Sequence, residues 1–344
     1  MQIERNTKFY LRFPVFLRIF AAVMKRILLI LIATSLLIPA MAGRPKIGLA
    51  LGGGGAKGAA EVGVLKVLEE AGIHIDCIAG ASIGSIVGGL YAAGYSASEL
   101  DTLFQTQEWF SLLTDRKALL MNEPYQNIDG ITYIFGFPIL DKNRRGIGIM
   151  QGGRIEQVLD SMVSVRGCTD FESLHIPFRC VAADIRTAEE VVNSDGLVYK
   201  AIRASIAIPG IFKPVEWGDW LLVDGGMLNN LPVDICRQMG ADIVIAIDLQ
   251  QSDTQPRKQE IEVGNVFGLA DILGINGILK WVANRPDIAK YSENRKDADI
   301  YIHPSLPDYD ITRFGNKNSA RMIQAGYSAA KKHWKELQKL ADRK

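Results

Sequence analysis

The sequence contains little cysteine, little histidine and almost no net charge. Among its 344 residues are four Cys and four His, and the formal net charge at pH 7 is +1. A charge so close to zero argues against a protein that binds nucleic acid electrostatically. The cysteines form no C-x-x-C pair and have no histidine at ligand spacing, so the sequence predicts no metal site. Cys77 and Cys180 lie in apolar, strand-like segments, which predicts buried thiols.

The small net charge hides an uneven distribution. Residues 1–42 hold six Lys or Arg and one Glu, and the rest of the chain is mildly acidic. From Met24 a basic start precedes an apolar stretch that ends in Ala40-Met41-Ala42, a pattern typical of a cleaved signal peptide. The apolar run is shorter than the about 20 residues that span a bilayer, which favours cleavage over anchoring. We therefore expect residues 1–42 to be a leader, with Met24 as a candidate start of translation. The protein would be periplasmic or secreted, or held at the inner membrane if the leader is kept.

Strand-like and helix-like segments alternate after the leader. Apolar runs typical of buried parallel strands lie at 46–51, 75–82, 178–185 and 241–249. Helical patterns lie at 56–72, 83–94, 152–163 and 232–240, and Ser96 with Glu99 forms a capping box that starts another helix. This rhythm predicts a three-layer α/β/α fold with a mostly parallel central sheet. Residues 43–344 are expected to form one domain.

Three further segments depart from the simple alternation. Residues 122–148 are rich in Gly, Pro and aromatic residues, which predicts a hairpin outside the sheet. Residues 266–285 form an interrupted amphipathic stretch, which fits a helix covering the core better than a helix lying at a membrane interface. Residues 298–304 suggest a last strand, and one long helix is expected from about Asn318 to the C-terminus.

A glycine-rich loop follows the first strand, in the sequence "LALGGGGAKGAAEVG". The spacing Gly53-x-Gly55-x-x-Gly58 fits a dinucleotide fingerprint, which also requires an acidic residue at the end of the second strand. Asp76 is the nearest acid and stands at the beginning of that strand. A phosphate-binding P-loop is excluded because Lys57 is not followed by Ser or Thr. The nucleotide interpretation is therefore weak.

A different motif ends the second strand. Gly80-Ala81-Ser82-Ile83-Gly84 has the G-x-S-x-G pattern of a nucleophile elbow, placed between a strand and a small-residue helix. Such a turn exposes the serine hydroxyl beside the N-terminal amides of the helix. A serine nucleophile also needs amide donors for the oxyanion of its tetrahedral intermediate. We expect the N–H groups of Gly53, Gly54 and Gly55 to supply them.

Ser82 needs a base, and the sequence offers two candidates. Asp224 ends an apolar strand and is followed by Gly225 and Gly226, a tight turn that presents a carboxylate at the strand end. Partial burial raises the pKa of such a carboxylate and makes a Ser–Asp dyad chemically workable. His303, at the end of the 298–304 strand, is the alternative base. The sequence favours Asp224.

These three motifs, in this order, resemble the patatin-like phospholipase family of serine acylhydrolases. "RASIAIPGIFKPV" (203–215) and "LNNLPV" (228–233) are similar to the stretches that flank the family's aspartate box. The resemblance covers about residues 45–249, leaving 250–344 as a C-terminal extension. Among bacterial members the chain looks nearest to small proteins that resemble the neuropathy target esterase catalytic domain.

The resemblance implies a lipid esterase. Ser82 would be the nucleophile, Asp224 its base, and residues 53–55 the oxyanion hole, with Gly58, Gly80, Gly84, Gly225 and Gly226 supporting the motifs. The family works without a metal or an organic cofactor. The expected substrate is a phospholipid or lysophospholipid, met at a membrane surface, and no nucleic acid is expected. The alternatives are a catalytically silent lipid-binding module on the same fold and, less favoured, a nicotinamide-dependent oxidoreductase.

Overall fold

The computed structural model describes the following parts of the chain: residues 20, 23–28, 44–113, 125–128, 131–134, 137–141, 152–209, 212–250, 287–306 and 315–343. Residues 45–343 form one compact unit, separate from residues 1–44. Most of the expected leader and the amphipathic stretch at 266–285 lie outside the described residues. Among the residues that are described, no helix combines the length and the apolar character needed to cross a membrane.

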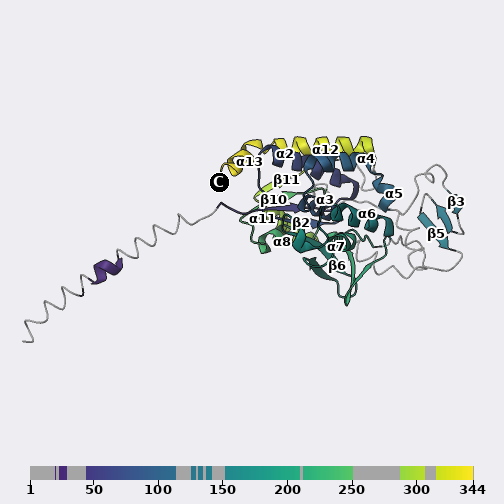
Figure 1. Cartoon of the computed structure of the whole chain (residues 1–344), viewed down its shortest axis with the longest axis horizontal. Helices are drawn as coiled ribbons and strands as arrows, with labels where there is room; N and C mark the ends of the chain where they lie inside the picture. Colours follow the sequence, from purple (N-terminus) through teal and green to yellow (C-terminus); the bar gives the residue numbers. More distant parts are fainter. Residues whose placement is uncertain are drawn as a thin grey trace, which may run out of the picture. The chain divides into compact units, whose positions relative to one another are not determined.

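A mixed β-sheet runs through the centre of the compact unit (Figure 1). Within the described residues it has eight strands, in the order β11-β10-β1-β2-β6-β9-β8, with β7 paired to β6. The parallel strands are β1 (Ile47–Leu51), β2 (Cys77–Ala81), β6 (Phe178–Asp184), β10 (Ile243–Ile247) and β11 (Ile300–Ile302). The antiparallel strands are β7 (Glu189–Asn193), β8 (Val215–Trp217) and β9 (Trp220–Asp224). The expectation of a mostly parallel sheet is confirmed.

Helices cover both faces of this sheet, as Figure 1 shows. On one face, a single apolar core joins the strands to α2 (Ala59–Glu70), α3 (Ile83–Ala92), α4 (Ala97–Thr106), α5 (Trp109–Leu113), α6 (Gly153–Ser164), α7 (Val198–Ser205), α12 (Asn316–Lys331) and α13 (Trp334–Ala341). The other face packs against α8 (Val233–Gln238) and α11 (Ile288–Asp297). Strand alternation separates the two cores, since Leu49 and Leu51 join the first cluster and Ala50 the second. The three layers match the expected fold class.

Three short 3₁₀ turns also occur in the part of the chain that the structure describes. They are the 3₁₀ turns η2 (Gly55–Gly58), η4 (Phe171–Ser173) and η5 (Gly225–Met227).

The predicted capping box is present, because the Ser96 side chain accepts from the Glu99 N–H and the Glu99 side chain accepts from the Ser96 N–H. All four cysteines are buried free thiols, as predicted for Cys77 and Cys180.

Two predicted segments differ in detail from the structure. The hairpin expected at 122–148 is a three-stranded antiparallel sheet of β3 (Tyr125–Ile128), β4 (Ile131–Ile134) and β5 (Phe137–Asp141). The single C-terminal helix is wrong, because α12 and α13 are separate. At the break, the Lys332 and His333 amides donate to carbonyls three residues back rather than four. The tighter turn redirects the chain so that Leu337 and Leu340 are buried in the core.

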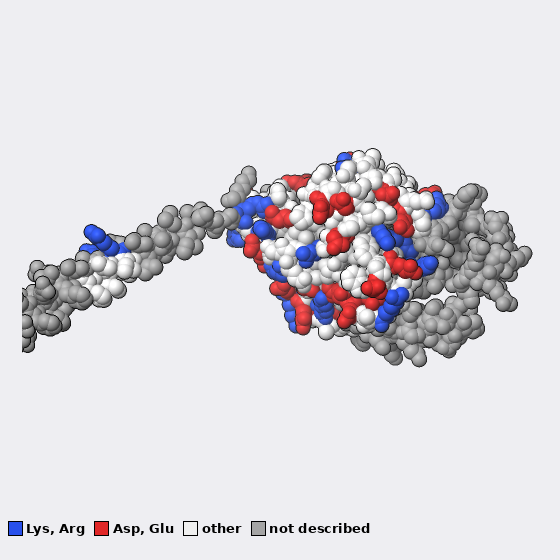
Figure 2. Space-filling model, turned by 60° about the horizontal axis from the view of Figure 1, so that its bottom comes forward, with Lys and Arg blue, Asp and Glu red and all other residues white. Residues whose placement is uncertain are grey.

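Charges on the surface are mixed rather than segregated. On the face shown in Figure 2, acidic and basic residues are interspersed. Around α8 and α11 they form ion pairs, such as Arg237 with Asp299 at 2.8 Å and Lys290 with Asp234 at 2.8 Å. Pairs as exposed as these contribute little stability each. The near-neutral composition is therefore distributed evenly over this face.

Helices α2 and α12 approach each other closely through two glycines. A Cβ atom added at Gly326 would lie 1.8 Å from the Ala60 carbonyl oxygen, and one at Gly63 would lie 1.9 Å from the Ile323 carbonyl oxygen. Both obstacles are helix backbone, which cannot move aside as a side chain can. The contact positions α2, the helix that follows the glycine loop.

We expect Gly326→Ala to lower the melting temperature, although alanine is the better helix former by about 1 kcal/mol. The added methyl group must push α12 away from α2, and overpacking of this kind costs roughly 1–3 kcal/mol. Gly153→Ala in α6 is the matched control, because a Cβ there has no neighbour within 4 Å. Thermal unfolding followed by circular dichroism checks both variants. Equal melting temperatures for the two would contradict the close helix contact.

Candidate active site

Ser82 occupies a strained turn between β2 and α3. Its backbone has φ 51° and ψ −124°, in the region of positive φ that residues other than glycine avoid. The turn closes only because glycines flank it. A Cβ at Gly84 would lie 2.5 Å from the Leu51 carbonyl oxygen, and one at Gly80 would lie 2.5 Å from the Gly84 carbonyl oxygen. This is the geometry expected of a nucleophile elbow.

Hydrogen bonds to two other serines stabilise this turn. The Ser82 N–H donates to the hydroxyl oxygen of Ser205 at 3.0 Å, and that hydroxyl donates to the Val181 carbonyl at 2.6 Å. The Ser85 hydroxyl donates to the Ser82 carbonyl at 2.6 Å. Sequence reasoning missed Ser205. One signal in the sequence could have found it, namely a serine enclosed by apolar residues in the 203–215 stretch. That stretch was used only as part of the family resemblance.

Ser82 and Asp224 meet at the edge of the sheet. The Ser82 Oγ donates a hydrogen bond to the Asp224 Oδ2 at 2.7 Å. Strand register explains this contact, because Ala81 pairs with Val181 on β6 and the next β6 residue, Ala182, pairs with Asp224. The two side chains therefore stand at the same level on either side of β6. Both are nearly buried, with 8% of Ser82 and 6% of Asp224 exposed.

The environment of Asp224 favours its neutral form more than water does. Burial raises the pKa of its carboxyl to about 6, although hydrogen bonds from Ser82 and from the Gly226 N–H act in the opposite direction. The Gly226 N–H donates to Oδ1 at 2.8 Å, which leaves Oδ2 to Ser82. Near neutral pH the group is mostly ionised, yet basic enough to accept a proton from a hydroxyl.

This raised pKa makes a prediction about stability. Ionising Asp224 in the folded protein is harder than in the unfolded chain, so its contribution to stability is lost as pH rises from about 4 to about 6. Asn has no proton to lose. We expect the free energy of unfolding of Asp224→Asn, relative to wild type, to rise by about 2 kcal/mol from pH about 4 to pH about 8. Denaturant unfolding at both pH values measures it, and a pH-independent difference would contradict a buried, titrating Asp224.

The glycine loop lies directly against Ser82. A Cβ at Gly53 would lie 3.0 Å from the Ser82 Cβ, and one at Gly58 would lie 2.2 Å from the Ile83 Cγ1. In contrast to the expectation for Gly53, its N–H is already donated to the Asn230 carbonyl oxygen at 3.1 Å.

The amides of Gly54 and Gly55 are different. In the described part of the chain, neither N–H has a hydrogen-bond acceptor. Of the three residues predicted to bind an oxyanion, only Gly54 and Gly55 therefore have an N–H group available for it. Gly55 has φ 58°, a conformation that favours glycine and turns the chain into η2.

His303, the alternative base, lies elsewhere. It follows β11, which is separated from β2 by β10 and β1. Its Nδ1 lies 3.0 Å from the Asp248 carbonyl oxygen, and its ring stacks on Tyr301. The structure therefore brings Asp224, and not His303, to Ser82.

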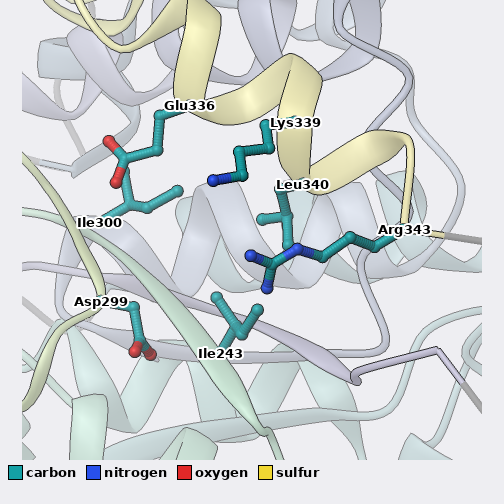
Figure 3. A pocket seen from close by; sticks show the side chains of 7 residues that line it. All are labelled: Ile243, Asp299, Ile300, Glu336, Lys339, Leu340 and Arg343. Carbon is teal, nitrogen blue, oxygen red and sulfur yellow. The ribbon is translucent and has the colours of Figure 1, made fainter.

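Figure 3 shows a separate pocket. The strand bounds place it at the amino edge of the sheet, opposite to the edge that carries Ser82. Its volume is about 280 Å³, and its lining residues are Ile243, Asp299, Ile300, Glu336, Lys339, Leu340 and Arg343. Ile243 and Ile300 begin β10 and β11, whereas Ser82 follows the end of β2. The pocket contains none of the predicted site residues. Among the described residues, no group of three or more His, Cys, Asp or Glu is arranged to hold a metal.

Comparison with known proteins identifies the family. A family model of the patatin-like phospholipases matches residues 49–237, a range that contains the glycine loop, the elbow and the aspartate box. The match covers more than half of the chain, so this protein belongs to the patatin-like phospholipase family. The resemblance inferred from the motifs is thereby confirmed, and with it the fold class.

Two relatives show the range of proteins that share this domain. The chain is 36% identical over 214 residues to an uncharacterised NTE family protein of Mycobacterium tuberculosis, covering 62% of this chain and 52% of that protein. It is 35% identical over 209 residues to patatin-like phospholipase domain-containing protein 6 of Homo sapiens, covering 60% of this chain and 14% of that protein. The chain thus spans about half the length of the mycobacterial relative. Among solved structures, VipD from Legionella pneumophila matches with a TM-score of 0.41 at 14% identity, over 86% of this chain and 67% of that one.

Proposed function

We propose that this protein is a serine acylhydrolase that cleaves acyl esters of phospholipids or lysophospholipids. The observation that carries the proposal is the 2.7 Å hydrogen bond from the Ser82 hydroxyl to the Asp224 carboxylate, next to a glycine loop with two available amides. A nucleophile, a base oriented toward it and oxyanion donors are the three components that acyl transfer requires. The lipid part of the proposal is supported by membership of the patatin-like phospholipase family.

The first half of the proposed reaction forms an acyl-enzyme. Asp224 Oδ2 accepts the proton of Ser82 as Oγ attacks the ester carbonyl carbon. The negative charge that develops on the carbonyl oxygen is stabilised by the N–H groups of Gly54 and Gly55 and by the positive end of α3. When the tetrahedral intermediate collapses, the C–O bond to the alcohol breaks, and the proton on Asp224 passes to the departing alkoxide. The acyl group remains on Ser82.

The second half uses the same groups with water. Asp224, again ionised, accepts a proton from a water molecule that attacks the acyl carbonyl. The second tetrahedral intermediate uses the same two amides and collapses to a free fatty acid, while the proton returns from Asp224 to Ser82. One carboxylate thus acts as base and then as acid in both halves. We further propose that the protein meets its lipid substrate at a membrane surface. We also propose that the leader directs export of the protein.

Variants of the two central residues test the proposal. Ser82→Ala and Asp224→Asn should each lower kcat for a short-chain nitrophenyl ester at least about 10³-fold, because each removes a group that acts in every turnover. Ser164→Ala and Asp297→Asn, on the exposed surface, are the matched controls and should keep wild-type rates. Labelling by a fluorophosphonate probe, located on the chain by mass spectrometry, should occur at Ser82 alone. A wild-type protein that neither turns over esters nor reacts with the probe would instead indicate a silent lipid-binding module.

The pH dependence of the reaction tests the base. Ser82 can transfer its proton only to ionised Asp224, whose pKa is about 6. We therefore expect kcat/KM for the nitrophenyl ester to rise tenfold per pH unit below that value and to level off above it. Measured rates across the acid range, with folding verified at each pH, check this. A flat profile between pH about 5 and pH about 8 would contradict Asp224 as the base.

A further inference from the structure

The side chain of Asn230 lies between the glycine loop and the turn that carries Asp224. A Cβ at Gly53 would lie 2.2 Å from the Asn230 Oδ1, and a Cβ at Gly226 would lie 2.3 Å from the same atom. One amide side chain therefore occupies the space that both glycines leave open. This accounts for glycine at two positions that are far apart in the sequence and belong to different motifs.

Asn230 also makes two hydrogen bonds to Gly53. The Gly53 N–H donates to the Asn230 backbone oxygen at 3.1 Å, and the Asn230 Nδ2 donates to the Gly53 carbonyl oxygen at 3.3 Å. The first bond occupies the Gly53 amide. The second holds the carbonyl group of the peptide that joins Gly53 to Gly54.

That second bond fixes the direction of a donor proposed for the oxyanion. A trans peptide is planar, so the Gly53 carbonyl and the Gly54 N–H point in opposite directions. Holding the carbonyl toward Asn230 therefore turns the Gly54 N–H away from it. A hydrogen bond to the carbonyl also polarises the peptide and makes its N–H a stronger donor.

Neighbouring hydrogen bonds keep Asn230 in place. Asn229, which is fully buried, donates to Asp234 Oδ1 at 2.8 Å and accepts from the Asn294 side chain at 3.0 Å. Its N–H donates to the Gly225 carbonyl at 3.0 Å. The segment after the aspartate box is thus attached to α8 and α11, so Asn230 extends from a rigid support.

We propose that Asn230 is a positioning residue, whose side-chain amide orients the Gly53–Gly54 peptide for oxyanion binding and sets its place relative to the Asp224 turn. This inference rests on the proposed function, since it assigns the oxyanion donors of that reaction. Asn230 does not itself touch the reacting atoms. It acts through Gly54 on one side and through Gly226 on the other.

Asn230→Asp is the sharpest test, because it preserves the shape and removes the donor. A carboxylate oxygen would then face the Gly53 carbonyl, and the two would repel each other. We expect kcat for the nitrophenyl ester to fall roughly 10- to 100-fold with KM changed less than about threefold, since orienting an oxyanion donor affects the transition state and not ester binding. Affinity for a trifluoromethyl ketone, which forms a tetrahedral adduct with a serine hydroxyl, should fall by a similar factor. Asn318→Asp in α12 is the matched control and should change neither value.

Asn230→Ala provides the second variant if the aspartate variant does not fold. It removes the same hydrogen bond without adding charge, and the same fall in kcat and in ketone affinity is expected, with folding verified by circular dichroism. A kcat within twofold of wild type in a folded variant would overturn the inference, and so would a rise in KM with kcat unchanged. The proposed function is tested separately, because its failure appears in wild-type protein as absence of turnover and of Ser82 labelling.

Discussion

The hydrogen bond between Ser82 and Asp224 is the contact on which the site depends, and strand register brings its two residues level with each other. Ser82 follows β2, Asp224 ends β9, and β6 lies between them and pairs with both. A slip of one residue in either pairing would move a side chain by about 3.3 Å along the strand and turn it to the other face of the sheet. The two apolar cores that flank the sheet oppose such a slip, because neighbouring residues of β2 and β6 are buried in different cores. Ile78 and Cys180 lie in one, and Ala79 and Val181 lie in the other.

Close backbone approach is the second constraint. The elbow, the glycine loop and the aspartate turn converge so tightly that side chains are excluded at several of their positions. Ser82 retains an unfavourable backbone conformation worth roughly 1–3 kcal/mol, which persists because Ser205 and Ser85 hold the turn from both sides. Asp224 is likewise kept in a buried position that an isolated carboxylate would avoid. Backbone strain and buried polar groups are concentrated where the proposed chemistry takes place. The packing and hydrogen bonds around the site offset their cost in stability.

Much of the fold and of the site follows from local patterns in the sequence. Continuous apolar runs identify the parallel strands at 46–51, 178–185 and 241–249, and the Ser96 capping box identifies a helix start. The elbow and the aspartate turn point to Ser82 and Asp224 as candidate residues, because each motif contains the conformational requirements of its own turn. The break between α12 and α13 was missed, since no Gly or Pro marks it. There, packing of Leu337 and Leu340 on the core overrides a continuous helical pattern.

Contacts between segments that are far apart in the sequence could be found only in the folded chain. Nothing in the residues around Asp224 indicates that β9 runs antiparallel to β6, yet this pairing is what brings the carboxylate level with Ser82. The state of the loop amides is also a tertiary property, because the acceptor of the Gly53 N–H comes from Asn230, 177 residues away. Turn and strand preferences are local and can be read along the chain. Hydrogen-bond partners across a sheet depend on register and on which groups are already occupied, and these arise only when the segments pack together.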